Sequence, residues 1–482
     1  MVGKEIVIVG AGMGGLALAL RLAHRGHRVT IYEKTDQIGG RNRKVALNDC
    51  EFDGGPTLLM MLEPFERLFK DAGERIEDHL RISKVNPSYR VFYRDGLRLK
   101  GLSDQDAMAE QIEAQFGKSE AEGFRRLMLD LKAMYDEAIP LFVRRNYDSP
   151  VDFGSAQGLS AVVRHGMLGN FAKRVARYVR DPRLRMLFSF QTMYLGLSPF
   201  SAPWVYATLT YMEYGEGIWY PEGGIAEIAA AIARLAEVRG AKIRLNEPVS
   251  GVDGSSVVLS SGAAHKADVV ILNADLPYAE KQLLSERPRK GRTYSCSGHV
   301  MYIDYRGALP ELDHHNVFFG EDFRKNLDQI FDRLELSEDP AFYAAVSCRS
   351  DRCKAPPGHE NLFILVPCPN LDHHWTESDA ERTRGVVFER LRHEVGFDPK
   401  RIAAIETFGP TEYATLLNLE KGAAFGLSHH FHQSAFLRPS NRSRRNRNVF
   451  FVGASTVPGN GLPMVLISAE LAEQRVLARF AT

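Results

Sequence analysis

The chain begins with an apolar run at residues 6–9, a glycine-rich turn, and a second apolar run at residues 29–32. Between them, residues 16–23 alternate leucine and alanine around one arginine, a composition that predicts a buried helix. Short continuous apolar runs are typical of strands covered on both faces, as in parallel sheets. The first 32 residues therefore predict a strand, a helix and a second strand.

The same alternation of helix and buried strand returns twice. Residues 225–235 are rich in alanine and predict a helix, and residues 268–274 predict a strand. Near the end, residues 448–453 predict another buried strand, which leads into a helix from about Met464 to Phe480. We expect one α/β domain assembled from residues 1–75, 218–280 and 440–482.

The two intervening stretches are expected to build a second domain from residues 76–217 and 281–439. The first stretch is mostly helical by the spacing of Phe124, Leu127 and Leu131. The second mixes helices with strand-like runs at residues 299–303 and 362–366. These strands are candidates for the floor of a pocket.

The first turn has the G-x-G-x-x-G spacing of a dinucleotide-binding site, at Gly10, Gly12 and Gly15. Glu33 follows 23 residues after Gly10, at the end of the second strand, where a carboxylate can hold a ribose hydroxyl. The glycines permit a tight turn, a close approach of pyrophosphate and packing of helix on strand. Gly14 and Lys34 belong to the same predicted contact set.

Two further glycine turns indicate which dinucleotide binds. Gly40 and Arg41 follow within a few residues of Glu33, and Gly55 and Pro56 come next. A guanidinium at Arg41 can contact a pyrophosphate that is already seated on the first helix. Nicotinamide enzymes seldom carry this pair of motifs, and the segment resembles the large flavoprotein group that includes amine oxidases and carotenoid desaturases. This resemblance implies FAD as the cofactor, and the first domain is expected to be a Rossmann-like FAD-binding domain.

Composition excludes several classes of protein. The 482 residues include 61 Lys and Arg against 60 Asp and Glu, which argues against nucleic acid as a main partner. Five cysteines without C-x-x-C spacing predict neither a zinc site nor a disulfide framework. The first strand starts at about Lys4, and no window has the length and apolarity of a membrane span. We expect a cytoplasmic protein.

Several segments outside the first glycine turn have characteristic sequence motifs. They are residues 188–199, 217–224, 340–343, 355–358, 365–367, 424–427, 436–439 and 452–463. They resemble the bacterial-type phytoene desaturase (carotenoid desaturase) family of FAD-dependent oxidoreductases. The resemblance spans nearly the whole chain. Ala454 stands where many amine oxidases have an acidic residue, whereas Val457 and Met464 depart from the family motif.

The resemblance implies an FAD-binding domain, an α+β substrate domain and a helical membrane-associating part. It also implies further flavin contacts at Val249, Gly453, Gly461, Leu462, Pro463 and Met464. A helix that starts after Gly461 would direct its amides at the flavin ring as it is reduced.

No catalytic acid or base is named, since a carbocation stabilised by conjugation needs no strong base. No metal is predicted, because adjacent histidines such as His314 and His315 would point to opposite faces of a strand. Asp53 and Glu222 lie in motifs next to the flavin, but they are expected to bond backbone amides or form turns.

Two basic segments have alternative interpretations. In residues 170–180, Phe171, Val175 and Val179 share a helical face among Lys and Arg, which fits either an interfacial helix or a helix packed in the core. Residues 438–447 contain five arginines and fit a solvated loop, a lipid head-group site or a site for the cofactor's phosphates.

The expected activity is desaturation of phytoene, diapophytoene or a hydroxylated carotene, by an enzyme bound peripherally to the cytoplasmic face of the membrane. The expected electron acceptor is oxygen or a membrane quinone. A carotene cis/trans isomerase and a carotenoid-binding flavoprotein without turnover remain alternatives. Ala454 disfavours a flavin amine oxidase.

Overall fold

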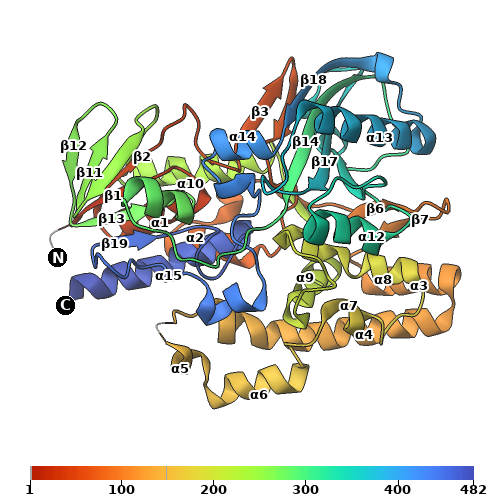
Figure 1. Ribbon diagram of the computed structural model, residues 1–482, viewed down its shortest axis with the longest axis horizontal. Helices are drawn as coiled ribbons and strands as arrows, with labels where there is room; N and C mark the ends of the chain where they lie inside the picture. Colours follow the sequence, from red (N-terminus) through yellow and green to blue (C-terminus); the bar gives the residue numbers. More distant parts are fainter. Residues whose placement is uncertain (1–2, 148, 482) are drawn as a thin grey trace.

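A five-stranded parallel sheet forms one end of the molecule (Figure 1). The computed structural model describes residues 3–147 and 149–481. The strand order is β19 (Val449–Phe451), β13 (Val269–Leu272), β1 (Glu5–Val9), β2 (Arg28–Tyr32) and β9 (Lys242–Arg244). The α/β prediction is confirmed, and the strands come from three separate stretches of the chain, although the predicted domain boundaries stay a prediction.

The register of this sheet brings four strand ends to one edge. Val9 lies opposite Leu272 on one side and Tyr32 on the other, and Leu272 lies opposite Phe451. In open parallel sheets, ligands bind outside the carboxyl ends of the strands. The segments that follow β1, β2, β13 and β19 therefore meet where a ligand site is expected.

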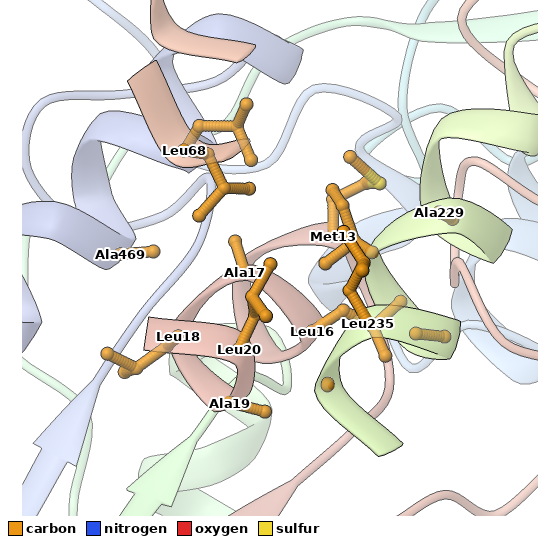
Figure 2. Packing of buried hydrophobic residues seen from close by; sticks show 14 of the residues in the cluster. Met13, Leu16, Ala17, Leu18, Ala19, Leu20, Leu68, Ala229, Leu235 and Ala469 are labelled. Atoms are coloured by element: carbon orange, nitrogen blue, oxygen red, sulfur yellow. The ribbon is translucent and has the colours of Figure 1, made fainter. Parts of the chain in front are cut away.

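Helices α1 (Met13–His24), α10 (Ala226–Val238), α15 (Leu462–Ala481) and α2 (Glu63–Asp71) pack together beside this sheet. Figure 2 shows α1 between Leu235 of α10, Ala469 of α15 and Leu68 of α2. Leu16, Leu18 and Leu20 are fully buried, and each contributes roughly 2 kcal/mol on transfer from water. The first helix is thereby fixed on the sheet.

A mixed seven-stranded sheet forms the centre of the second half of the molecule. Its order is β18 (Ile402–Phe408), β14 (Ser297–Arg306), β17 (His359–Cys368), β16 (Phe342–Val346), β15 (His315–Phe318), β6 (Tyr89–Phe92) and β7 (Arg98–Gly101). Side chains alternate between its faces. Met301 and Ile303 pack in the same cluster as Val387 of α13 (Glu377–Val395), whereas Tyr302 belongs to a cluster on the opposite side.

A helical layer lies against this sheet, along the bottom and lower right of Figure 1. It contains α3 (Gln105–Phe116), α4 (Lys118–Ala138), α5 (Pro150–Phe153), α6 (Ala156–His165), α7 (Phe171–Val175), α8 (Pro182–Leu187) and α9 (Thr208–Tyr211). Phe124, Leu127 and Leu131 of α4 are fully buried, as their helical spacing predicted. Short 3-10 and π-helical turns, among them η3 (Phe190–Leu195), η5 (Met212–Glu216) and η9 (Arg352–Lys354), complete the layer and its connections.

The remaining elements connect these layers. They are the hairpin β3 (Lys44–Leu47) with β4 (Cys50–Asp53), the pair β5 (Ile82–Lys84) with β8 (Trp219–Pro221), the three-stranded sheet β10 (Val249–Asp253), β11 (Ser256–Leu259) and β12 (Ala264–Lys266), and helices α11 (Leu276–Tyr278), α12 (Phe323–Asp328) and α14 (Pro410–Thr415). No helix among residues 3–147 and 149–481 has the length and apolarity needed to cross a bilayer.

Candidate functional site

The turn between β1 and α1 is the first part of the site. Gly10 has a φ of +101°, which favours glycine, and its carbonyl accepts a hydrogen bond from Asn273 Nδ2 at 3.1 Å. A Cβ at Gly15 would lie 2.4 Å from the Gly10 carbonyl oxygen, so only glycine lets α1 pack this closely on β1. The amides at the start of α1 therefore face the strand edge, where they can bind a phosphate.

Glu33 is held beside this turn. Its Oε2 accepts a hydrogen bond from the Ala11 amide at 2.9 Å, and its Oε1 accepts from the Thr35 amide at 3.0 Å and the Thr35 hydroxyl at 2.9 Å. These bonds fix the orientation of a carboxylate that lines the main cavity. Lys34 lines the same cavity, and burial lowers the pKa of its amine.

Arg41 lies on the other side of the turn before α1. The glycine turn, Glu33, Arg41 and the turn before α15 line one end of the cavity and are called the cradle. A β-bridge joins Gly12 to Gly39. Gly40 has a φ of +60°, and a Cβ built at Gly40 would lie 3.3 Å from Gly12 Cα, so the two turns pack closely. Arg41 Nη1 donates to the Ala424 carbonyl at 2.9 Å. Burial lowers the pKa of Arg41, and the negative charge of Asp275 partly opposes this shift. Because an arginine side chain stays charged in proteins, Arg41 places a cation on the cavity wall.

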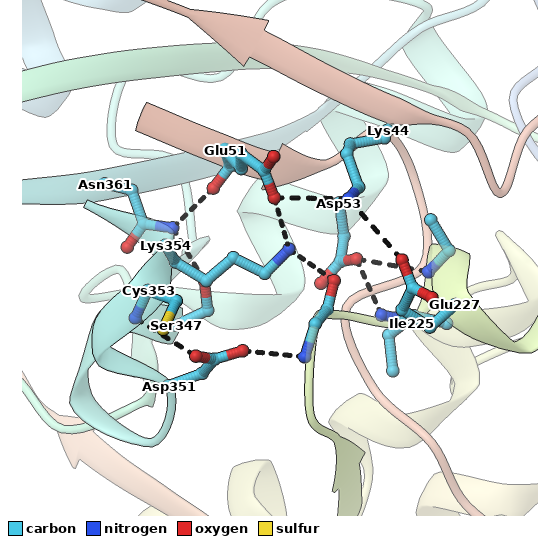
Figure 3. Close-up of polar contacts among 12 residues, drawn as sticks. Lys44, Glu51, Asp53, Ile225, Glu227, Ser347, Asp351, Cys353, Lys354 and Asn361 are labelled. Atoms are coloured by element: carbon cyan, nitrogen blue, oxygen red, sulfur yellow. Dashed lines mark hydrogen bonds and ion pairs between the residues drawn. The ribbon is translucent and has the colours of Figure 1, made fainter. Parts of the chain in front are cut away.

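The loop between β4 and the cavity is anchored by Asp53. Its Oδ1 accepts a hydrogen bond from the Ile225 amide at 2.7 Å, as expected for a residue that bonds backbone amides (Figure 3). Lys354 Nζ donates to the Gly223 carbonyl and contacts Glu51 Oε2 at 3.2 Å. Burial raises the pKa of Asp53 to about 6 although Lys354 opposes this. Glu222, in contrast, is exposed and lies 3.6 Å from Arg81.

The turn that follows β19 closes the cradle. The Gly453 amide donates to Ser468 Oγ at 3.2 Å, and α15 begins at Leu462 with its first turn on the cavity. Gly461 lines the cavity, and a Cβ built there would have no atom within 4 Å, which leaves room for a ligand. Asn460 also lines the cavity, and its buried Oδ1 has no hydrogen-bond partner among the described residues.

Arg438 corrects the interpretation of residues 438–447 as one basic patch. Its side chain is only 3% exposed and donates to the carbonyls of Ala454 at 2.7 Å, Thr456 at 3.0 Å and Ser428 at 3.2 Å. Burial lowers the pKa of Arg438 to about 10. The sequence does not signal this role, because a lone arginine beside exposed arginines such as Arg444 gives no sign of its burial.

Most of the predicted contact residues meet on one cavity of about 550 Å³. Those that line it are Gly10, Gly12, Gly14, Glu33, Lys34, Gly40, Arg41, Gly55, Pro56, Val249, Gly453, Gly461, Leu462 and Pro463. Gly15 lies behind the wall against β1, and Met464 packs with Met61 and Ile467 instead. Asn273, which the sequence analysis missed, lines the cavity and contacts the glycine turn.

These residues fit FAD. The cradle combines the N-termini of α1 and α15 with the carboxylate of Glu33 and the guanidinium of Arg41. The unpartnered Oδ1 of Asn460 and the open space beside Gly461 mark where a polar ring edge can lie. Beyond the cradle the cavity continues between apolar walls. The residues there include Phe190, Val317, Phe319, Phe323, Leu327 and Leu365. One cavity therefore joins a dinucleotide cradle to an apolar chamber.

Polar groups interrupt the apolar chamber at two places. Tyr343 and Thr57 line it and hydrogen bond to each other at 2.9 Å. Tyr194 lines it as well, and behind its ring the buried Glu213 of η5 accepts from the Tyr194 hydroxyl at 3.1 Å. Burial raises the pKa of Glu213 to about 8, so this carboxyl is protonated at neutral pH.

Residues 170–180 do not offer an apolar face to lipid. Phe171, Val175 and Val179 are each at most 1% exposed and pack in the cluster around α4, so the core alternative is the correct one. Apolar side chains are exposed instead just before this segment. Leu159 and Val163, which are 53% and 80% exposed, lie four residues apart on one face of α6, and Leu168 is 61% exposed.

The candidate metal ligands are apart from this cradle. His314 and His315 are buried with their ring centroids 4.1 Å apart, so the prediction that they point to opposite faces of a strand is wrong, because His314 lies just before β15 begins. His373 lies 3.6 Å from Asp379 at the start of α13. Among the residues that the structure describes, no group of three or more His, Cys, Asp or Glu is arranged to hold a metal ion.

Known proteins resemble this chain over its whole length. A zeta-carotene-forming phytoene desaturase from Myxococcus xanthus is 39% identical and covers 98% of this chain and 94% of its own length. A 4,4'-diapophytoene desaturase (4,4'-diapolycopene-forming) from Methylomonas sp is 33% identical, with 99% and 96% covered. Cyclohexylamine oxidase from Brevibacterium oxydans IH-35A shares the fold, with a TM-score of 0.61, 15% identity and 99% of both chains covered.

The family model of flavin containing amine oxidoreductases matches residues 13–477. This range begins within the glycine turn, just after Gly12, and includes both stretches between the segments of the α/β domain as well as the closing turn. The chain therefore belongs to the flavin containing amine oxidoreductase family and, within it, to the group that contains the phytoene and diapophytoene desaturases.

Proposed function

We propose that this chain is an FAD-dependent carotenoid desaturase that introduces double bonds into an acyclic polyprene. The observation that carries the proposal is the single cavity in which the dinucleotide cradle opens into an apolar, aromatic-lined chamber. Relatives named as desaturases of phytoene, diapophytoene and carotenoids support it.

Removing two hydrogens from a saturated carbon pair requires a hydride acceptor, which no side chain provides and which FAD supplies when bound. The chain's own residues position that cofactor. Glu33 is placed to hold a ribose hydroxyl, and Arg41 together with the start of α1 is placed to hold the pyrophosphate. The first turn of α15 is placed to direct its amides at the ring edge that gains negative charge on reduction.

The chamber's task is to hold the polyene flat and dry. Phe190, Phe319 and Phe323 contribute aromatic surface, and their rings contact one another edge to face at 5.7 Å and 5.5 Å. Aliphatic and aromatic walls exclude water, which protects a cation formed on the substrate from capture. The proposed substrate is phytoene, diapophytoene or a hydroxylated carotene, which differ in chain length and end group.

A lipid-dissolved substrate gains almost nothing by crossing water, so the enzyme is proposed to dock on a bilayer. We propose α6 and the turn that follows it as the docking element. Leu159, Val163 and Leu168 offer exposed apolar side chains there, and the exposed Arg145 and Lys173 flank them along the chain. This combination of apolar and basic side chains is typical of surfaces drawn to anionic lipid. At the bottom of Figure 1, α6 lies along the lower edge of the molecule.

Product analysis tests the activity. Purified holoenzyme is mixed with liposomes that carry phytoene, diapophytoene or a hydroxylated carotene, and the products are analysed by absorbance and mass. Desaturation predicts a loss of two hydrogens per step and a longer polyene chromophore. Isomerisation would leave the mass unchanged, and a binding protein would leave both mass and chromophore unchanged. Either result would contradict the proposal.

Liposome co-sedimentation tests the docking element. Replacing Leu159 and Val163 with aspartate is expected to weaken binding to anionic liposomes about tenfold or more, since each buried aliphatic side chain contributes roughly 1.5–3 kcal/mol. Val238→Asp is the matched control, because Val238 is 74% exposed on α10. Equal binding by the wild type, the double variant and the control would exclude α6 as the docking element.

A further inference from the structure

Each desaturation step leaves one proton in the apolar chamber. A charge left in such surroundings is unfavourable by several kcal/mol, so the proton must reach water. Glu213 is a poor acceptor because burial already keeps its carboxyl protonated at neutral pH. The histidine pair His314 and His315, which has no part in the cofactor cradle, lies behind the chamber wall and offers another route.

Tyr343 connects the chamber to this pair. Its side chain lines the chamber, and its hydroxyl accepts a hydrogen bond from Thr57 Oγ1 at 2.9 Å. The same hydroxyl lies 2.6 Å from Nδ1 of His315, which is fully buried. Because Thr57 donates to Tyr343, the Tyr343 proton is free to point at His315 Nδ1. His315 then carries its own proton on Nε2.

The route continues to the surface through the second histidine. The rings of His315 and His314 are in contact, with centroids 4.1 Å apart. The buried His314 places its Nδ1 2.7 Å from the hydroxyl of Ser350, which is exposed. The Nε2 atoms of both histidines are buried without a hydrogen-bond partner among the described residues. Proton transfer between the two rings requires one Nε2 to donate to the other.

The surroundings keep both imidazoles neutral at rest. Burial lowers the pKa of His314 to about 3, and the nearby carboxylate of Asp351 opposes this shift only weakly. Burial also holds the pKa of His315 well below its ordinary value. The other groups that face the pair are the rings of Tyr220 and Tyr89, which are uncharged. A C–H bond beside a carbocation is far more acidic than an imidazolium, so even these weak bases can accept its proton.

We propose that Tyr343 removes the substrate proton and that His315, His314 and Ser350 conduct it to solvent. The inference rests on the proposed desaturase function. One substrate C–H bond breaks and its two electrons leave as hydride to the bound flavin, which is the oxidant. The neighbouring C–H bond then breaks, its electron pair forms the new double bond, and its proton passes to the Tyr343 oxygen.

The relay restores the charge of every residue but leaves each imidazole in its other tautomer, so both rings must return to their resting tautomers before the next turnover. The Tyr343 proton moves to His315 Nδ1, the His315 Nε2 proton moves to His314 Nε2, and the His314 Nδ1 proton moves through the Ser350 hydroxyl to water. Tyr343 is the catalytic residue in this scheme, because it touches the substrate chamber. The two histidines and Ser350 act through it.

The test compares single turnovers of holoenzymes that carry Tyr343→Phe or His315→Gln. Both are expected to form product about 10²-fold more slowly than the wild type, a typical contribution of positioned proton transfer. FAD affinity is expected to stay unchanged for Tyr343→Phe, which keeps the ring, whereas the unfolding midpoint is expected to fall because Thr57 Oγ1 and His315 Nδ1 lose a hydrogen-bond partner. His299→Gln is the matched control, because His299 is a buried histidine beside Trp375 and away from the chamber.

Two further measurements separate a relay from a structural role. The wild type is expected to show a solvent deuterium isotope effect on product formation, and imidazole is expected to restore part of the activity of His315→Ala. Spectra of holoenzyme with 15N-labelled histidine are expected to show the proton of His315 on Nε2 and that of His314 on Nδ1. Rates above half of wild type for both Tyr343→Phe and His315→Gln, or the opposite tautomers, would overturn the relay. A wild type that makes no desaturated product would instead overturn the proposed function.

Discussion

Arg438 offers the sharpest test of how the closing turn is held. Replacing it with methionine keeps a long apolar stem and removes the guanidinium that bonds the carbonyls of Ala454, Thr456 and Ser428. Arg444→Gln is the matched control, because Arg444 lies in the same basic segment with its side chain exposed.

The magnitude follows from the geometry. The buried carbonyls of Ala454 and Thr456 lose their side-chain donor, whereas the Ser428 carbonyl keeps a hydrogen bond from Gln433 Nε2 at 3.1 Å. An unsatisfied buried polar group costs about 1–3 kcal/mol. The variant no longer has to bury a cation, which is itself unfavourable: burial lowers the pKa of Arg438 to about 10. Removing this cost offsets part of the loss. We expect Arg438→Met to reduce the free energy of unfolding by about 3 kcal/mol and Arg444→Gln to change it by less than about 0.5 kcal/mol.

The assay is urea unfolding of holoenzyme, followed by far-UV circular dichroism and by flavin fluorescence. Because Ala454 follows Gly453 on the cavity wall, flavin release is expected to occur at a lower urea concentration than global unfolding in Arg438→Met. Wild-type behaviour of Arg438→Met in both signals would refute the reasoning. An equal loss in Arg444→Gln would also refute it, since that result would assign the effect to the charge of the segment.

Three other predictions follow from the site. Gly15→Ala is expected to lower stability by about 3 kcal/mol in urea unfolding, because its Cβ would lie 2.4 Å from the Gly10 carbonyl oxygen; an unchanged midpoint would contradict the packing of α1 on β1. Glu33→Ala is expected to weaken FAD binding about tenfold or more in a fluorescence titration, with loss of a ribose hydrogen bond and of the bond to the Ala11 amide. Glu213 has a pKa raised by burial from 4.5 to about 8, so the folded state binds its proton more tightly and the wild type loses stability as pH rises from about 4.5 to 8. Glu213→Gln should abolish that loss, which amounts to on the order of 4 kcal/mol; parallel pH profiles for the two proteins would rule it out.

The exposed and buried apolar segments show where sequence reasoning is limited. Residues 171–179 and α6 both place apolar residues on one helical face, and both carry basic neighbours. The structure buries Phe171 and Val175 and exposes Val163. An amphipathic pattern says that one face is apolar, but only the neighbouring elements decide whether that face is covered.

The sequence alone determined the cofactor cradle and the class of fold. Gly10, Gly12, Glu33 and Arg41, which were predicted as cofactor contacts, all line one cavity, because a strand, a tight turn and a helix form a local unit whose geometry is set by neighbouring residues. Their contact with FAD stays a prediction. Apolar runs likewise identified the buried strands, since only a sheet covered on both faces tolerates them.

Only the tertiary structure decided how distant residues complete the site. Asn273 packs on the glycine turn from more than 200 residues away, Arg438 is buried among backbone carbonyls, and Tyr343 joins Thr57 to His315 across two parts of the chain. Burial and hydrogen-bond partners of polar residues arise from long-range packing, and no local pattern encodes them. The residues of the cradle were therefore predictable, whereas the contacts on which the proposed proton route rests are apparent only in the folded protein.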